Sequence, residues 1–238
     1  IFKGKEDRLR FREKIGFFSK KRNKGKLIWF HGASVGEIQS IIPLLERFEK
    51  NKEIRQILVT SNTVSSSFII KNLKFKKTIH QFFPIDCNFI SKKFLNYWKP
   101  SKAFFIDSEI WPVTINNLYK RNTPIFLLNG RITRKSFKRW KVFSSFSQSI
   151  FGKFDLCLSS NIETKKYLKK LGAKNIKIIG NLKFSQSENE KTNLNKDLVN
   201  LINSRKTWCA SSTHYNEEEF CGKVHIKLKK KFKNLLTI

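Results

Sequence analysis

Three acidic residues stand in the short segments that follow apolar runs, where a carboxylate could take part in chemistry. Glu37 ends the small-residue turn "HGASVGE" (31–37), and Asp107 and Glu109 form "DSE" after "AFFI". Backbone N–H groups in a first helical turn favour a carboxylate by about 0.3–1 kcal/mol, which would keep Glu37 ionised, as a general base must be. An acid that only serves the helix start has the same spacing, so the sequence leaves both interpretations open.

The "DSE" triplet (107–109) resembles the D-x-D metal clamp of many nucleotide-sugar transferases, in which two carboxylates bind Mg²⁺ through oxygen. The following "IWP" predicts a helix with Pro112 near its first turn, so the two acids could instead only cap that helix. Lys183 in "GNLKF" follows another apolar run, and it could stabilise an anion or be one surface lysine among many. His31 and His214 have no partners for a triad, which favours a structural role.

Seven short apolar runs predict the strands that would position these side chains. They are residues 27–30, 56–60, 80–84, 103–107, 125–129, 155–160 and 176–181. Segments with helical spacing of apolar residues separate them, which predicts βαβ units and a parallel sheet covered on both faces. Ligands of such sheets bind at the carboxyl ends of the strands, where the loops are rich in Gly, Ser, Asn and single charges.

A composition break follows the last of these runs. We assign 1–184 to a first domain and 185–205 to a linker, because 185–197 has almost no apolar residues. A second α/β unit is predicted over 206–238, with a basic helix before a final strand. The chain begins at Ile1, contains no Met and ends inside that strand, so we expect a piece of a longer reading frame whose second domain is cut short.

Composition narrows the class of protein. The apolar content of 39%, with 23 Phe, predicts a folded chain. The net charge of +31 indicates an anionic partner, such as nucleic acid, a phospholipid surface or a phosphorylated substrate, although an AT-rich genome also produces such a composition. Four cysteines without a C-x-x-C pair indicate reduced thiols rather than a zinc site or a disulfide framework.

Seven motifs in order resemble the Kdo transferase family, whose members transfer 3-deoxy-D-manno-octulosonic acid (Kdo). The motifs are "HGASVGE", "TSNTVSSS", "PIDC", "DSEIWP", "NGRITRKS", "GNLKF" and "ASSTHYNEEE". The resemblance implies a GT-B fold of two Rossmann-like α/β domains with the active site between them. It also implies a bacterial enzyme of lipopolysaccharide biosynthesis on the cytoplasmic face of the inner membrane. Kdo would move from CMP-Kdo to the lipid A precursor lipid IVA, with inversion and without a metal or other cofactor.

The resemblance also implies roles for individual residues. Glu37 matches the catalytic base of the family, and Asp107 and Lys183 match two residues that stabilise the transition state. Asp107 departs from the family, which has Glu there, so its side chain is one methylene shorter but keeps the charge. The same motifs supply the substrate-binding candidates Ser34, Gly36, Glu109, Arg131, Ser212 and His214. The first domain would bind the acceptor, and residues 206–238 would begin the donor-binding domain.

Three other functions stay open. Another GT-B glycosyltransferase would share the same fold, and an interaction fragment without activity would need no complete site. A basic nucleic-acid-binding α/β protein would need exposed aromatic residues along a basic stripe. The aromatic residues here fall mostly within predicted strands and helix faces, so we expect no nucleic acid partner. An anionic membrane surface fits the basic segments 3–14 and 19–26 better.

Overall fold

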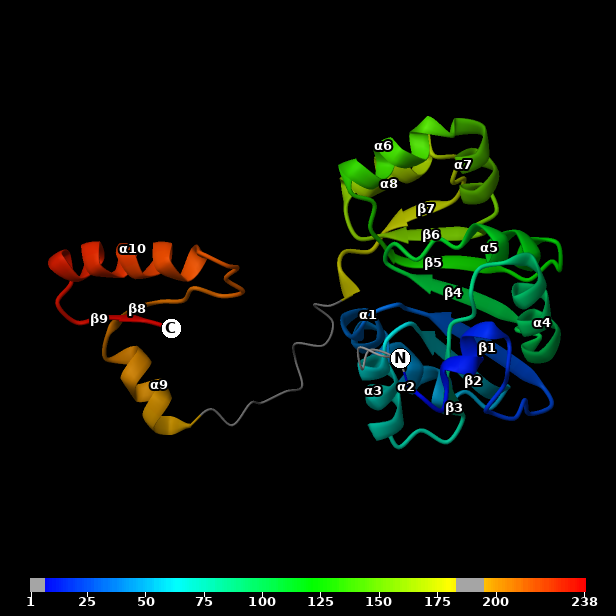
Figure 1. Cartoon of the computed structure of the whole chain (residues 1–238), viewed down its shortest axis with the longest axis horizontal. Coiled ribbons are helices and arrows are strands. Elements are labelled where there is room, and N and C mark those ends of the chain that lie inside the picture. The colour runs from blue at the N-terminus through cyan, green and yellow to red at the C-terminus, as the bar shows by residue number, and fades with distance from the viewer. Residues whose placement is uncertain (1–6, 183–194) are drawn as a thin grey trace. The chain divides into compact units, whose positions relative to one another are not determined.

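The computed structural model describes residues 7–182 and 195–238, in two compact units with a boundary between residues 188 and 189 (Figure 1). Unit 1 is built on a seven-stranded sheet in which every neighbouring pair is parallel. Its strands are β1 (Lys26–His31), β2 (Ile54–Ser61), β3 (Thr78–Phe82), β4 (Lys102–Ile106), β5 (Ile125–Gly130), β6 (Leu156–Ser159) and β7 (Ile176–Ile178). The α/β fold class and all seven predicted strands of this sheet are confirmed.

The strand order is β3-β2-β1-β4-β5-β6-β7, so the chain changes direction across the sheet at β1. β2 and β3 extend the sheet on one side of β1, and β4 to β7 extend it on the other. In open parallel sheets, ligands bind in the crevice outside the carboxyl ends of the two strands at such a switch point. The loops that follow β1 and β4 therefore define the place where a site is expected.

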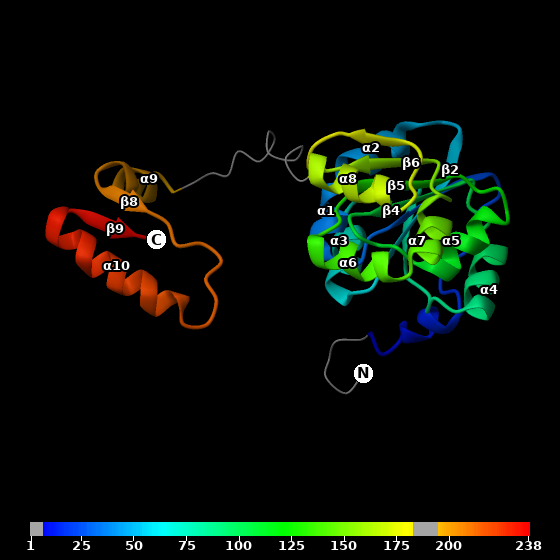
Figure 2. The ribbon, with the colours of Figure 1, turned by 90° about the horizontal axis from the view of Figure 1, so that it is seen from above.

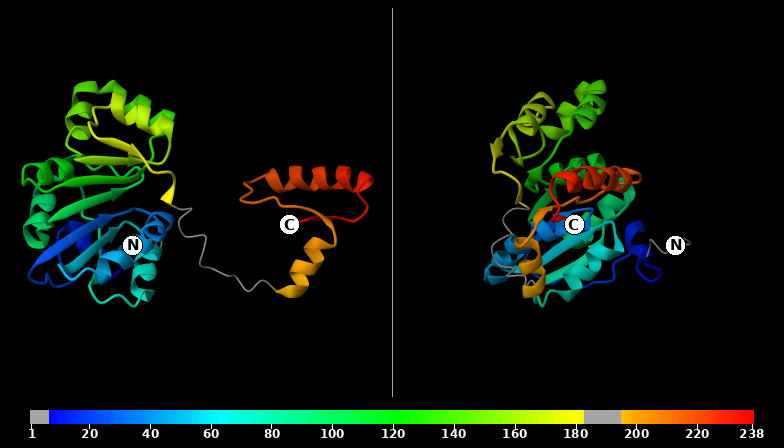
Figure 3. Two further views of the ribbon diagram at one scale, coloured as in Figure 1. Left: turned by 180° about the vertical axis from the view of Figure 1, so that it is seen from behind. Right: turned by 90° about the vertical axis from the view of Figure 1, so that its left-hand side faces the viewer.

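Helices cover both faces of the sheet (Figures 2 and 3). They are α1 (Val35–Ser40), α2 (Ile42–Lys50), α3 (Val64–Asn72), α4 (Asn88–Trp98), α5 (Pro112–Tyr119), α6 (Arg134–Val142), α7 (Ser144–Phe151) and α8 (Ile162–Lys170). Successive strand residues point to opposite faces. Trp29 thus packs in one cluster with the buried apolar side chains of α4, α5 and α7. Ile28 and Phe30 pack in a second cluster with those of α1, α2 and α3. Both faces are apolar, as a doubly covered parallel sheet requires.

A short 3-10 helix, η1 (Phe11–Ile15), anchors the start of the described chain to the β3 edge of the sheet. Its Glu13 is buried, accepts a hydrogen bond of 2.7 Å from the backbone N–H of Phe82, and forms an ion pair with Arg10. The guanidinium of Arg10 also donates to the backbone carbonyl of His80. Part of the basic N-terminal segment is thus bound within the fold, whereas its described residues Arg8 and Arg12 are exposed.

Unit 2 contains α9 (Lys196–Asn203), β8 (Lys206–Trp208), α10 (Glu217–Lys231) and β9 (Leu235–Thr237). β8 and β9 pair in parallel, and α10 connects them and lies along them (Figures 1 and 2). α9 lies within the range 185–205 that we assigned to a linker. It forms because Asn195 caps it by accepting from the N–H of Asp197, and because apolar residues return at 198. Residues 185–194 of that range lie outside the described residues.

Within residues 7–182 and 195–238, no helix is both long enough and apolar enough to cross a bilayer.

Candidate active site

Glu37 lies at the carboxyl end of β1, in the first turn of α1. Ser34 is the N-cap of this helix. Its hydroxyl accepts from the N–H of Glu37 at 3.4 Å and donates to the carboxylate at 2.9 Å, and the N–H of Ala33 donates to the other carboxylate oxygen at 2.7 Å. The arrangement is related to a capping box, in which a Glu three residues after the N-cap bonds back to the helix start. Gly36 is the residue between Val35 and Glu37 in this turn.

The backbone approaches Glu37 closely at Gly32. A Cβ atom added there would lie 3.1 Å from the Cβ of Glu37 and 3.2 Å from the Cδ1 of Ile38. That separation is tighter than ordinary van der Waals contact, so a larger residue at position 32 would displace one of these side chains. The absence of a Cβ atom at Gly32 therefore allows the Glu37 side chain to lie close to the end of β1.

The pKa of Glu37 is raised above its usual value, mainly because burial penalises the charged form. The N–H of Ala33 lowers the pKa, Glu109 raises it, Ser34 lowers it and Asp107 raises it. The helix start alone would have favoured the charged carboxylate, so the net direction is opposite to that of the helix dipole. A raised pKa makes an ionised carboxylate a stronger proton acceptor, which suits a general base.

Asp107 follows β4, the neighbour of β1 on the other side of the switch point. It is buried, and its carboxylate accepts a hydrogen bond from the side-chain amide of Asn129. Both residues have left-handed backbone conformations, with φ of 56° and 52°. Asp and Asn tolerate this region better than other non-glycine residues. The side-chain oxygen of Asn129 also accepts from the N–H of Leu182, which joins the ends of β4 and β5 to the segment after β7.

Glu109 lies beside Asp107 in the loop after β4, with 14% of its side chain exposed. Its Oε2 accepts from the indole N–H of Trp111 at 2.9 Å and lies 3.3 Å from Nε2 of His31. His31 is the last residue of β1 and is fully buried. Glu37 lies in the turn after β1, Asp107 and Glu109 follow the adjacent β4, and Glu109 contacts the last residue of β1, so three carboxylates gather at the switch point.

The first N–H groups of α5 are satisfied by Asp86 and not by the two acids of "DSE". Asp86 accepts from the N–H of Val113 at 3.0 Å and from the N–H and hydroxyl of Thr114 at 2.8 and 2.7 Å. The interpretation of Asp107 and Glu109 as caps of this helix is therefore wrong. Asn129 binds the Asp107 carboxylate instead, and His31 and Trp111 contact that of Glu109.

A polar cavity of about 270 Å³ opens beside Asp107 at the carboxyl ends of β4 to β7. It is lined by Asp107, Asn129, Arg131, Ser160, Asn161 and Asn181. Arg131 contributes an exposed guanidinium, and its backbone N–H bonds to the carbonyl of Asp107 at 3.0 Å. Amide, hydroxyl, carboxylate and guanidinium groups around one hollow are suited to binding the hydroxyls and charges of a sugar.

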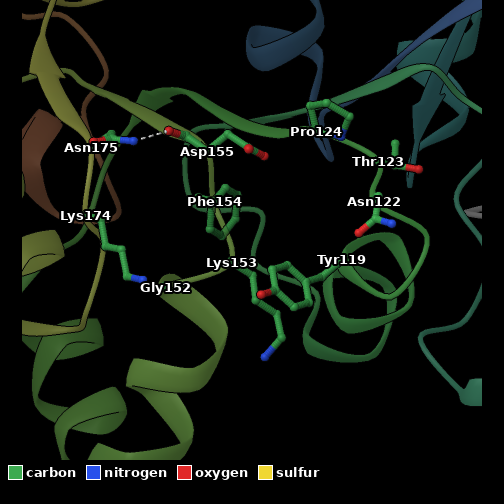
Figure 4. Close-up of a pocket in the computed structure, with 10 residues that line it drawn as sticks. All are labelled: Tyr119, Asn122, Thr123, Pro124, Gly152, Lys153, Phe154, Asp155, Lys174 and Asn175. Atoms are coloured by element: carbon green, nitrogen blue, oxygen red, sulfur yellow. Dashed lines mark hydrogen bonds between the residues drawn. The ribbon is translucent and has the colours of Figure 1, made fainter.

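A second cavity, of about 440 Å³, lies at the amino ends of the strands (Figure 4). Residues before β5, β6 and β7 line it, among them Asn122, Lys153 and Lys174, and the amide of Asn175 donates to the backbone carbonyl of Asp155 there. The amino ends of the strands are remote from the loops that carry the three carboxylates. This cavity is thus separate from the candidate active site.

The remaining predicted site residues fall elsewhere. Lys183 lies outside the described residues. Ser212 and His214 belong to unit 2, in the loop between β8 and α10, where the N–H of His214 donates to Glu217 at 2.7 Å. Among the residues that the structure describes, no group of three or more His, Cys, Asp or Glu side chains is placed to hold a metal ion.

The sequence does not predict a functional role for two members of the site. The sequence favours a structural role for His31, because its contact with Glu109 joins residues 78 positions apart. Asn129 gave one local signal, the Asn-Gly pair at the end of an apolar run, which favours a left-handed conformation. Its bond to Asp107 depends on the adjacency of β4 and β5, which the strand runs alone do not specify.

Comparison with solved structures identifies the class of fold. The chain is similar to the UDP-GlcNAc 2-epimerase of Neisseria meningitidis, with a TM-score of 0.59 and 10% identity over 89% of this chain and 64% of that one. It is also similar to the UDP-N-acetylglucosamine 2-epimerase of Rickettsia bellii, with a TM-score of 0.56 and 12% identity over 90% and 62%. These likenesses show the fold alone, which is of the GT-B type.

Sequence comparison identifies the family. Residues 9–186 match the model of the 3-deoxy-D-manno-octulosonic-acid transferase family, and the chain belongs to this family. It is 36% identical over 232 residues to the 3-deoxy-D-manno-octulosonic acid transferase of Rickettsia bellii, covering 95% of this chain and 54% of the relative. The corresponding enzyme of Haemophilus influenzae is 29% identical over 97% and 55%. The chain thus spans about half the length of the curated relatives it matches.

Proposed function

We propose that this chain is part of a glycosyltransferase that moves Kdo from CMP-Kdo to a lipid A precursor, with Glu37 as the general base. The observation that carries the proposal is the gathering of Glu37, Asp107 and Glu109 at the switch point of the sheet. Membership of the Kdo transferase family supports the same activity.

In the proposed reaction, the Glu37 carboxylate removes the proton from a sugar hydroxyl of the acceptor. The resulting oxygen attacks the anomeric carbon of Kdo as the bond to the CMP phosphate breaks, so the anomeric configuration inverts. Lys183 would stabilise the anionic donor and its leaving phosphate, since a cation aimed at developing charge lowers the barrier. Asp107 would stabilise the transition state beside the polar cavity. No metal or other cofactor takes part in this proposal.

The substrate-binding roles are proposals at the same level. Ser34 and Gly36 shape the turn that holds Glu37, and Glu109 and Arg131 face the same edge of the sheet. For Ser212 and His214 of unit 2 we also propose a substrate-binding role. The acceptor is an anionic lipid, and we propose that the enzyme works at the cytoplasmic face of the bacterial inner membrane, where its basic segment meets anionic lipid.

The full-length enzyme with Glu37→Gln tests the proposal. The substitution keeps the shape of the side chain but removes its basicity. We expect turnover to fall by roughly 10²–10⁴, the usual contribution of a general base, with little change in substrate affinity. The measurement is Kdo transfer from CMP-Kdo to lipid IVA at matched concentrations of folded protein.

A variant that removes a helix cap is the control that distinguishes a catalytic role of Glu37 from a role in stabilising the helix start. Thr63 caps α3 at the same edge of the sheet, accepting from the N–H of Ser66 at 3.3 Å. Thr63→Ala should lower the melting temperature slightly and leave turnover near that of the wild type. If Glu37→Gln behaves in the same way, Glu37 serves only the helix start, and the base must be sought elsewhere.

A further inference from the structure

A chain of hydrogen bonds runs from the middle of β1, where its links are buried, to the candidate site, where they are half-buried. The indole N–H of Trp29 donates to Oγ1 of Thr60 at 2.9 Å. The same oxygen lies 3.0 Å from Nδ1 of His31, and Nε2 of His31 lies 3.3 Å from Oε2 of Glu109. Trp111 donates to that carboxylate oxygen as well, at 2.9 Å. The contacts connect the sheet interior to Glu109 without a gap.

The chemistry of the first link sets the direction of the others. An indole N–H can only donate, so the Thr60 oxygen accepts from Trp29 and keeps one proton to give. Two acceptors compete for this proton: Nδ1 of His31 at 3.0 Å and the backbone carbonyl of Phe30 at 3.3 Å. The nitrogen is the nearer one. If it accepts, the proton of a neutral His31 must sit on Nε2, where it points at Glu109.

The opposite tautomer would leave one hydrogen-bond acceptor without a donor. Nδ1 would then carry the proton and donate to the backbone carbonyl of Thr60, which lies 3.2 Å away. The lone pair of Nε2 would face the Glu109 carboxylate at 3.3 Å, so two acceptors would meet in a buried place. An acceptor left without a donor away from water loses its hydration without compensation. The tautomer with the proton on Nε2 satisfies every group in the chain.

The surroundings of His31 favour a neutral ring. The imidazole is fully buried, stacks on Phe83 with the ring centres 3.9 Å apart, and meets Phe105 and Trp111 edge to face. Burial lowers the pKa of His31 below its usual value, although Glu109 acts in the opposite direction. A neutral imidazole has a single proton, so its position decides whether Glu109 receives a hydrogen bond.

We propose that His31 is a positioning residue: Thr60 fixes its neutral Nε2–H tautomer, and the ring then donates to Glu109 and holds that carboxylate beside Glu37. The tautomer of His31 follows from the contacts of this chain alone. The importance of a fixed Glu109 carboxylate for catalysis rests on the proposed function. Glu109 would otherwise be held by Trp111 alone among these groups, and a single bond leaves the carboxylate free to rotate about it.

The tautomer can be measured directly by ¹⁵N NMR of the imidazoles at pH 7. The chain has four histidines, and His31 is assigned by the loss of its signals in His31→Gln. We expect the wild type to show a protonated Nε2 and an unprotonated Nδ1. Thr60→Val removes the hydroxyl at nearly constant shape and should make the Nδ1–H form dominant, whereas Thr60→Ser should restore Nε2–H. An Nδ1–H ring or an imidazolium in the wild type would overturn the proposal, even if Thr60→Val does not fold.

Activity of the full-length enzyme tests the positioning role separately. Thr60→Val should lower kcat by about 10- to 100-fold, the range that follows from losing one hydrogen bond to a charged group, and Thr60→Ser should recover most of it. Equal kcat in the two variants, with the tautomer changed in Thr60→Val, would refute positioning. A wild-type enzyme with the Nε2–H tautomer but no Kdo transfer would instead count against the proposed function and leave the tautomer assignment standing.

Discussion

At the scale of single residues, the paired left-handed conformations of Asp107 and Asn129 are the main departure from regular backbone at the candidate site. Residues outside their preferred φ/ψ regions persist where the surrounding structure over-determines them, and they cluster at functional sites. Here the determinants are the side-chain bond between the two residues and the bond from the N–H of Leu182 to Asn129. These bonds thus keep the Asp107 carboxylate at the wall of the polar cavity.

Two substitutions at position 129 separate backbone strain from hydrogen bonding. Asn129→Gly loses the side-chain bonds but keeps a residue that accepts positive φ. Asn129→Ala loses the same bonds and adds the left-handed penalty, so it should be less stable than Asn129→Gly by about 1 kcal/mol. Denaturant unfolding of this chain measures the difference. Equal stability of the two variants would show that the backbone relaxes at this position.

The acidic limb of the pH–rate profile should report Glu37. As the pH falls below the raised pKa of Glu37, the base becomes protonated and kcat/KM falls. Glu109→Gln removes a negative charge that raises this pKa, so the limb should move to lower pH, whatever the loss in maximal rate. The profile is measured with full-length enzyme. A limb that stays in place would mean that another group sets it.

At the scale of elements, the cap of α5 comes from a loop distant in sequence. Asp86 follows β3 and accepts three hydrogen bonds from Val113 and Thr114 at the start of α5. Asp86→Ala should cost roughly 1–2 kcal/mol of unfolding free energy, the upper part of the range for cap removal. Thr63→Ala, which removes the cap of α3, should cost less. The reverse order in a denaturant titration would contradict this account.

The strands of the sheet could be predicted because each one is a short apolar run bounded by turn residues. Only ends were misjudged, as at β7, which stops at Ile178 because the chain turns at Gly180 with φ of 79°. The order of the strands could not be predicted, since apolar runs do not specify their neighbours. The apolar residues from 198 on predict a helix, but the linker range 185–205 included it because its first residues have the composition of the linker before it.

The position of a site residue was predictable where it follows a strand directly, as Asp107 does, or lies in the short turn after one, as Glu37 does. The burial of His31 against Glu109 and the bond between Asp107 and Asn129 required the strand order, because each joins the end of one strand to the loop after its neighbour. The direction of the Glu37 pKa was not predictable either. The helix start was visible in the sequence, but the burial and the two neighbouring acids were not.

At the scale of the whole molecule, the net charge is +31, and some of the cations are bound within the fold while others are exposed. Arg10 is bound to buried Glu13, and Arg22 donates to the backbone carbonyl of Trp98. Arg8 and Arg12 are exposed beside Leu9, whose exposed fraction is 90%. Cations next to an exposed apolar side chain are suited to an anionic lipid surface.

This chain should therefore bind anionic vesicles, and less tightly as salt increases. Reversing two charges with Arg8→Glu and Arg12→Glu should cost at least about 2 kcal/mol, or roughly 30-fold in the binding constant. The control is Lys165→Glu with Lys166→Glu on α8, which packs by β6 and β7 at the other end of the sheet from η1. Vesicle co-sedimentation measures both. Equal losses in the two double variants would indicate that only total charge matters.

The position of β1 between β2 and β4 has a consequence for synthesis of the protein. A ribosome releases β1 and β2 before the other strands of this sheet, and these two strands can pair at once. The other edge of β1 is completed only by β4, whose residues 102–106 are translated some seventy residues later. Until then, an apolar strand edge is open to pairing with another nascent chain. We expect the interval between these two strands to be the period in which the newly made protein depends most on chaperones.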